Sequence, residues 1–412
     1  MALPTPAPWR AGTLPIRGSD LRGLTRLGVD ATLGVTDLVE AMHHTIASGA
    51  GLVGRAPTGR TNGITGFVYG SVRAVTRGVG RGLDAVLGAL AGPAGADAST
   101  DEREAFVAAL NGIWGDHLAA SGNPLAIRMA LRIGGRALDL GGPPLAPQLA
   151  APRPRLVVFV HGLCMSDLQW TRQGHDHGRA LADELGFTPL YLSYNSGRHV
   201  SENGREFAAL LERLVALWPV PVEELAIVGH SMGGLVARSA CHVATVDGLA
   251  WLARLRKLVF LGTPHHGAPL ERGGRLVDGA FGLSPFVAPF ARLGKARSAG
   301  ITDLRYGNLQ DADWQGRDRH AQRRDDRQPT PLPPGVSAYL IAASLAARPG
   351  RLHRNVVGDG LVPLSSALGE HRQPELALSV PASHRHVVAE CGHLDLLCHD
   401  EVTARLRAWL SR

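Results

Sequence analysis

Short apolar runs alternate with helical patterns along the second half of the chain. Each run is long enough for one buried strand: 156–160, 189–193, 225–228, 258–261, 338–343 and 386–389. Helical periodicity is found at 176–185, 201–218 and 401–410. Two short segments around Gly134-Gly135 predict a β-hairpin ahead of this series. Strands that alternate with helices predict a mostly parallel sheet covered on both faces, which is an α/β fold.

The first part of the chain has a different pattern. Apolar residues recur at helical spacing between 21 and 46 and again between 63 and 88, and a third helix is expected to end near Ala120. We therefore expect an N-terminal helical region over 1–120, followed by the α/β domain over 121–412.

Arginine repeats at every fourth residue of the second predicted helix, at Arg73, Arg77 and Arg81. This spacing predicts a basic stripe on one side of a helix whose other side is apolar. Two interpretations follow. Either the helix packs on the domain with its charged side in water, or residues 21–90 contact the headgroups and acyl chains of a membrane.

A long stretch interrupts the strand series at 268–336. Residues 268–300 are apolar and rich in glycine, whereas 312–335 are rich in arginine and proline. The first part is expected to form a cap over the site or, alternatively, an inserted helical pair of the core. The second part is expected to be an exposed loop.

Composition narrows the class of protein and its partners. The chain has 412 residues, a net charge of +7 and an aromatic content of 5%. Because its few aromatic residues are not interleaved with a basic stripe, nucleic acid is not an expected partner. The sequence has no apolar run long enough for a signal peptide or a membrane span, so we expect a cytoplasmic protein that either is soluble or lies at a membrane surface.

The most informative motif is Gly229-His230-Ser231-Met232-Gly233, which stands between an apolar strand and a helical stretch. A strand–turn–helix with glycine on both sides of a serine is typical of a nucleophile elbow. The tight turn admits only small residues at 229 and 233 and exposes the serine hydroxyl above the sheet. We therefore predict that Ser231 is a nucleophile.

A serine nucleophile requires a base and an acid that orients the base, and on such a fold they follow it in the order acid, then histidine. Asp359 stands between two glycines after a predicted strand, and His393 follows the last predicted strand. These two are the preferred residues. The alternatives for the base are His384 and His386, and those for the acid are Asp303 and Glu370.

An oxyanion hole requires two backbone N–H groups that point at one position. One is expected from Met232, which directly follows the nucleophile. The other is expected from the loop His161-Gly162-Leu163, with Leu163 as the donor.

Five motifs in this order resemble the α/β-hydrolase superfamily: 160–163, 229–233, 261–267, 358–360 and 392–393. Within it they are similar to the branch of bacterial lipases and GPI-inositol deacylases, and the resemblance extends over about 155–412. It implies an α/β-hydrolase fold and a serine carboxyl-ester hydrolase that uses Ser231, Asp359 and His393. No cofactor or metal is implied, although some bacterial lipases bind a calcium ion through an aspartate at the position of Asp395.

The apolar cap and the amphipathic helices favour lipid-like acyl esters as substrates. A thioesterase or an acyltransferase would use the same three residues. A non-catalytic, membrane-associated binding protein with the same fold is the alternative from a different class.

Overall fold

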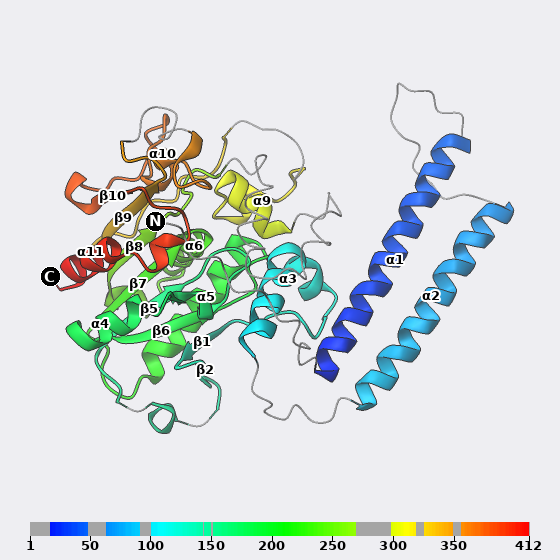
Figure 1. Ribbon diagram of the computed structural model, residues 1–412, viewed down its shortest axis with the longest axis horizontal. Helices are drawn as coiled ribbons and strands as arrows, with labels where there is room; N and C mark the ends of the chain where they lie inside the picture. The colour runs from blue at the N-terminus through cyan, green and yellow to red at the C-terminus, as the bar shows by residue number, and fades with distance from the viewer. Residues whose placement is uncertain are drawn as a thin grey trace, which may run out of the picture. The chain divides into compact units, whose positions relative to one another are not determined.

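A computed structural model describes residues 17–47, 63–90, 100–142, 144–149, 151–268, 298–318, 325–348 and 356–411. The chain forms two compact units (Figure 1). The smaller unit consists of 1–103 with 120–125, and the larger consists of 104–119 with 126–412. The predicted domain boundary at residue 120 stays a prediction.

An eight-stranded sheet forms the centre of the larger unit, in the order β10-β9-β8-β7-β3-β6-β1-β2. Its strands are β1 Ala130–Ile133, β2 Arg136–Ala137, β3 Arg155–Val160, β6 Thr188–Ser193, β7 Glu224–His230, β8 Leu255–Leu261, β9 Ser337–Ser344 and β10 Arg385–Ala389. Strands β4 (Thr171–Arg172) and β5 (His175–Asp176) form a separate ribbon. Every pair from β6 to β10 is parallel, whereas β1 runs antiparallel to β6 and β2. The predicted α/β fold and the hairpin are thereby confirmed.

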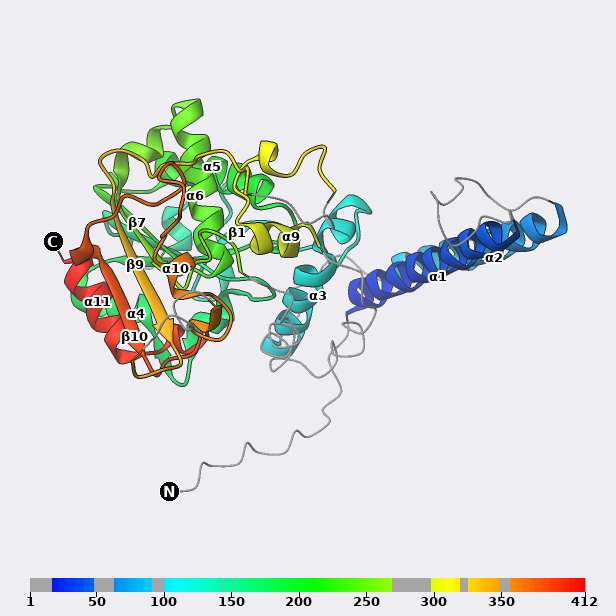
Figure 2. The ribbon, with the colours of Figure 1, turned by 90° about the horizontal axis from the view of Figure 1, so that it is seen from above.

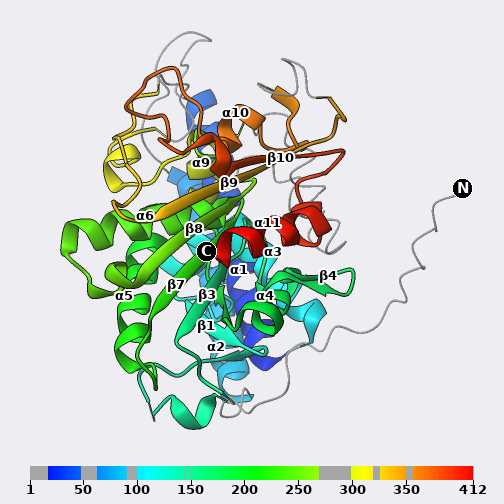
Figure 3. The same ribbon diagram turned by 90° about the vertical axis from the view of Figure 1, so that its left-hand side faces the viewer.

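Helices cover both faces of the sheet, as Figure 2 and Figure 3 show. The described helices from residue 101 onward are α3 Asp101–Ala120, α4 His177–Leu185, α5 Val200–Leu217, α6 Met232–Asp247, α9 Ala299–Tyr306, α10 Leu364–Ala367 and α11 Asp400–Leu410. Successive side chains of a strand point to opposite faces. Val158 and Val160 accordingly pack with α5 and α6, whereas Val157 and Phe159 pack with α4 and α11.

The parallel strands all end at one edge of the sheet, and this edge positions the candidate site. The last residues of neighbouring strands are in register, for example Val160 opposite Gly229 and His230 opposite Leu261. The loops that leave β3, β7, β9 and β10 therefore begin side by side. These loops contain the predicted oxyanion, nucleophile, acid and base residues respectively.

The smaller unit is a pair of long helices, α1 (Gly18–Ala47) and α2 (Gly63–Leu90), which pack against each other. Asp84 of α2 forms ion pairs with two arginines of α1, at 2.7 Å from Arg22 and 2.6 Å from Arg26. The helices approach closely at Gly80, where an added Cβ would lie 2.8 Å from Val29 Cγ2. Both helices were predicted from their apolar spacing.

The basic stripe predicted on α2 is wrong at Arg73. Its side chain is buried and forms ion pairs with Asp37 and Glu40 of α1. Because the period of the helix turns residue 73 toward α1, this arginine joins the two helices instead of facing solvent. Arg77 and Arg81 are exposed.

The outer side of α2 is apolar. Its exposed aliphatic side chains follow one helical face: Val68, Val72, Val75, Val79, Leu83 and Val86. No helix among the described residues is both long and apolar enough to cross a bilayer.

Part of the predicted insertion lies outside the described residues, namely 269–297 and 319–324. Within the described part, 298–318 contains α9, and 325–336 runs without regular structure into β9. The predicted cap therefore remains a prediction. All four cysteines, two of which flank the predicted base, are free thiols.

Candidate active site

Ser231 stands on a strained turn between β7 and α6. Its φ of 53° is a conformation that residues other than glycine rarely adopt. The turn is held from below, because the Ser231 N–H donates to the carbonyl of Leu261 at 2.9 Å. This is the geometry of a nucleophile elbow, and α6 begins directly after it with its positive end at the serine.

Glycines permit the close approaches that this turn requires. A Cβ at Gly229 would lie 2.6 Å from Gly234 Cα, and one at Gly233 would lie 2.1 Å from the Val160 carbonyl oxygen. Gly234 is equally constrained, since its Cβ would lie 2.0 Å from Thr263 Oγ1. The sequence singled out Gly229 and Gly233, and the structure adds Gly234.

Asp359 and His393 form a hydrogen-bonded pair in the interior of the loops after β9 and β10. The His393 imidazole donates from Nδ1 to Asp359 Oδ2 at 2.7 Å. The other carboxylate oxygen accepts the backbone N–H groups of Leu361 and Val362, at 3.0 and 2.8 Å. Both side chains are buried. With its Nδ1 proton engaged, a neutral His393 carries its lone pair on Nε2 and can act there as a base.

The loop that contains His393 packs against the nucleophile elbow at Ser231. His230 Nε2 donates to the carbonyl oxygen of His393 at 3.1 Å, and an added Cβ at Gly262 would lie 3.1 Å from the His393 ring. Burial, and next the proximity of His393, holds the pKa of His230 well below its usual value, so it is a neutral donor. No hydrogen bond joins Ser231 to His393 among the described residues, a contact that often tightens only when substrate is bound.

The loop after β3 passes against the nucleophile. A Cβ at Gly162 would lie 3.1 Å from Ser231 Cβ. Burial lowers the pKa of His161 to about 4, and its neutral ring donates from Nδ1 to the Gly162 carbonyl at 2.8 Å. Because the peptide bond between them is trans, the carbonyl of Gly162 and the N–H of Leu163 point in opposite directions.

Both predicted oxyanion donors are available at this edge of the sheet. The N–H of Leu163 donates to no described residue. The N–H of Met232 lies in the first turn of α6, where an N–H has no partner within the helix. Neither N–H has a hydrogen-bond partner among the described residues, and both remain candidates for the oxyanion hole.

Helix α3 packs against the loop that follows β3, a contact that the sequence did not reveal. A Cβ at Gly112 would lie 2.2 Å from Cys164 Sγ, and one at Gly115 would lie 1.8 Å from Asn195 Oδ1. Ile113 of the same helix packs with Cys164, next to Leu163. The signal was present as two glycines inside a helix, where glycine is unfavourable unless another chain comes close.

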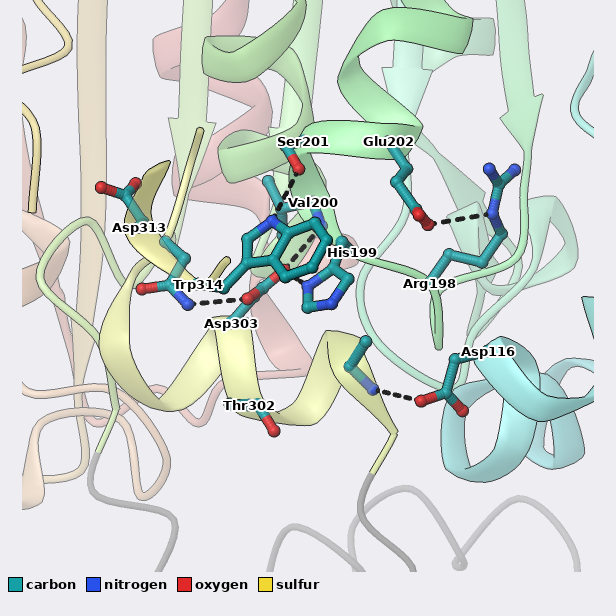
Figure 4. A network of polar contacts seen from close by, with 12 residues as sticks. Asp116, Arg198, His199, Val200, Ser201, Glu202, Thr302, Asp303, Asp313 and Trp314 are labelled. Carbon is teal, nitrogen blue, oxygen red and sulfur yellow. Dashed lines mark hydrogen bonds and ion pairs between the residues drawn. The ribbon is translucent and has the colours of Figure 1, made fainter. Parts of the chain in front are cut away.

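The alternative acid and bases lie elsewhere. Asp303 is buried and accepts from His199 Nδ1 at 2.9 Å and from the N–H of Val200 at 2.8 Å, in the network of Figure 4. His199 there stacks on Trp314, so Asp303 joins α9 to the start of α5. His384 bonds the Ala338 carbonyl, His386 pairs with Glu401, and Glu370 pairs with Arg385.

The residues around Asp395 do not resemble a cation site. The Asp395 carboxylate accepts the N–H of Gly392 at 3.1 Å within its own turn. Over the described ranges, no group of three or more His, Cys, Asp or Glu side chains is arranged to hold a metal ion. A calcium ion at Asp395 therefore has no support from its surroundings.

The sheet order and the nucleophile elbow define an α/β hydrolase by fold. Residues 152–279 match the PGAP1-like alpha/beta domain family, a stretch that runs from β3 past β8 and includes Ser231. The match covers less than half of the chain and ends before Asp359 and His393. It agrees with the branch that the motifs resemble.

Solved structures with a similar course of the chain include lipases and an esterase. The mature Bacillus licheniformis lipase BlEst2 is 18% identical, with 69% of this chain and 98% of that one covered and a TM-score of 0.42. Aspergillus fumigatus lipase B is 11% identical, with 67% and 54% covered and a TM-score of 0.36. The Pyrococcus furiosus esterase Pf2001 is 16% identical, with 63% and 81% covered and a TM-score of 0.36. With such scores they say nothing about substrate. No curated protein matches the sequence.

Proposed function

We propose that this protein is a serine carboxyl-ester hydrolase, a lipase or esterase that acts on lipid-like esters through an acyl-enzyme. The observation that carries the proposal is the Asp359–His393 pair at 2.7 Å, in a loop bonded to the elbow of Ser231. A buried carboxylate fixed by two backbone N–H groups and aimed at a histidine is the arrangement that orients a catalytic base.

In the proposed reaction Ser231 Oγ attacks the ester carbonyl while His393 Nε2 accepts its proton. Asp359 keeps the imidazole in the required tautomer and stabilises its positive charge. The N–H groups of Leu163 and Met232 hold the oxyanion of the tetrahedral intermediate. His393 then gives the proton to the leaving alkoxide, which leaves an acyl group on Ser231. Water, activated by the same histidine, hydrolyses this ester and restores the enzyme.

Substrate assays test this function. The purified chain should hydrolyse p-nitrophenyl esters, and the Ser231→Ala variant should not. Thioesters and an added alcohol acceptor in the same assay reveal a thioesterase or an acyltransferase, because both use the same residues. If no ester, thioester or acyl transfer is turned over and Ser231→Ala behaves as the wild type, the protein is instead a non-catalytic member of the fold.

The proposal extends to where the enzyme works, which is in the cytoplasm at the surface of an anionic membrane. The exposed aliphatic face of α2 supplies the apolar contact with lipid. The single acid of α2, Asp84, is engaged by Arg22 and Arg26, whereas Arg77 and Arg81 are exposed. By the helical period these two arginines lie on the other side of α2 from the valines, so they attract the membrane at longer range.

Vesicle binding distinguishes the contributions of the two sides. Val75→Gln with Val79→Gln should abolish binding to anionic phosphatidylserine vesicles, whereas Arg77→Gln with Arg81→Gln should weaken it mainly at low salt. Hydrolysis of a soluble short-chain ester should stay at the wild-type rate in both. Unchanged vesicle binding by the valine variant would contradict the membrane contact and leave the hydrolase proposal intact.

A further inference from the structure

A small cavity lies beside α6, away from the candidate catalytic residues. Its volume is about 10 Å³, and its lining includes Arg238, His265, Asp313 and Arg327. A cavity of this size has room for a single small ion or a water molecule. Its lining is unusual because three buried nitrogens have no hydrogen-bond partner among the described residues: Arg238 Nε, His265 Nε2 and His266 Nε2.

Arg238 is the first of these groups. The side chain is 5% exposed and comes from the second turn of helix α6. One terminal nitrogen donates to the carbonyl of Thr330 at 2.6 Å, and the other contacts His265 Nδ1 at 3.4 Å. Its Nε–H is buried and has no partner among the described residues. Arg238 forms no ion pair with any described residue, although a buried charge normally requires one.

His265 is the second group, and its neighbour determines its tautomer. Arginine can only donate, so the Nδ1 that faces Arg238 is an acceptor. Burial, and next the charge of Arg238, holds the pKa of His265 well below its usual value, so the ring is neutral. Its proton is therefore on Nε2, and this atom is buried with no partner among the described residues. Arg238 Nε and His265 Nε2 are thus both donors. The neighbouring His266 faces Arg327 with its Nδ1 at 3.3 Å, so its Nε2 is a third donor at the lining.

The charges at the cavity favour a negative occupant. Arg327 forms a bidentate ion pair with Asp325, from Nε to Oδ1 at 2.8 Å and from Nη2 to Oδ2 at 2.7 Å. Arg327 therefore has its own counter-ion. Asp313 faces the cavity, but its carboxylate accepts the backbone N–H groups of Leu309, Gln310 and Gln328. The charged residues of the lining are thus two arginines and one aspartate. Burial, and next the charge of Arg327, lowers the pKa of Arg238 to about 9, which leaves it charged at pH 7.

We propose that this cavity binds one monoatomic anion, chloride under ordinary conditions, between Arg238 Nε–H and His265 Nε2–H. The anion neutralises a buried charge at the point where α6, the loop after β8 and the segment 325–330 meet. Since α6 begins at the nucleophile, the site stabilises the part of the fold that supports Ser231, and it does not take part in the chemistry.

Two measurements on the full chain test the site. The melting temperature of the wild type should rise by about 2 °C when sodium gluconate is exchanged for sodium chloride at constant ionic strength. Crystals soaked in sodium bromide should show an anomalous peak within hydrogen-bond distance of Arg238 Nε. Both measurements need only the wild-type protein, so they decide the proposal even if variants fail to fold.

Variants assign the effect to the cavity. Arg238→Met should lose the chloride dependence of the melting temperature. Arg132→Met is the control, because Arg132 is a largely buried arginine that has counter-ions in Glu104 and Asp167. This variant should have a lower melting temperature than the wild type, and that temperature should still depend on chloride. A melting temperature that is indifferent to chloride, or a water without anomalous signal in the cavity of bromide-soaked crystals, would overturn the proposal.

Discussion

Glycine plays opposite roles in the two units of this protein. At the elbow, Gly229, Gly233 and Gly234 each lie so close to another backbone or side chain that a Cβ would come within 2.0–2.6 Å of it. On helix α2, the space around Gly78 and Gly82 is open, and Gly80 alone among the α2 glycines with described surroundings packs closely against α1. The comparison shows that glycine permits close packing at the site in the larger unit, whereas Gly78 and Gly82 of α2 serve no such contact with a described residue.

The largest effects are expected at the residues proposed for chemistry. Ser231→Ala and His393→Ala should each lower kcat by about 10⁴–10⁶, because nucleophile and base act as a unit. His386→Ala is the matched control, since His386 bonds Glu401 and lies outside the pair. Steady-state kinetics with a p-nitrophenyl ester measures both. A fully active His393→Ala beside an inactive His386→Ala would show that the wrong histidine was chosen.

The glycine comparison predicts the next largest effect. Gly229→Ala should lower kcat by at least about 100-fold, because a new Cβ displaces the elbow and misplacement of a nucleophile by 1 Å has costs of that order. Gly78→Ala should leave kcat unchanged and raise stability by up to about 1 kcal/mol, because alanine is the better helix former. Kinetics and thermal melting check the pair. Equal effects of the two substitutions would remove the distinction between the units.

The pH profile tests whether the base is a histidine. Only the neutral imidazole accepts a proton, so kcat/KM should fall about tenfold per pH unit below roughly pH 6–7. His230 and His161 contribute no step in this range, because burial has lowered the pKa of each and both are already neutral. A rate that stays flat between pH 5 and 8, with circular dichroism showing a folded protein, would argue against a histidine base.

The smallest effect on catalysis is expected from the arginines of α2. Arg73→Gln should lower the melting temperature of the α1–α2 pair, because it removes the buried ion pair between Arg73 and Glu40. Arg77→Gln should change it little, since Arg77 is exposed. Neither should alter the turnover of a soluble ester. Circular dichroism measures the melting temperature of each variant. Equal melting temperatures of the two variants would contradict the assignment of Arg73 to the helix interface.

The sequence predicted the sheet and the elbow because their signals are contiguous. An apolar run before Gly229 and a helical pattern after Met232 suffice to place Ser231 on a strand–turn–helix. Asp359 and His393 could be proposed because the ends of parallel strands meet at one edge. Those predictions depended on local pattern and chain order alone.

Contacts between distant segments could not be predicted in this way. Gly112 of α3 approaches Cys164, and Arg73 pairs with Glu40 of another helix, and no local pattern identifies the partner in either contact. The cavity at Arg238 needs His265 and Thr330 as well, which the chain brings together only through the fold. In each case the side chain was visible in the sequence, but its partner was not.

Labelling with a lipid-like fluorophosphonate tests the central claim most directly, since this reagent reacts only with a serine that a base has activated. The account predicts one adduct per chain, located by peptide mass spectrometry at Ser231. The adduct should be absent from Ser231→Ala and form at least about 100-fold more slowly in His393→Ala. An adduct on another serine, or equal labelling of the wild type and His393→Ala, would contradict it.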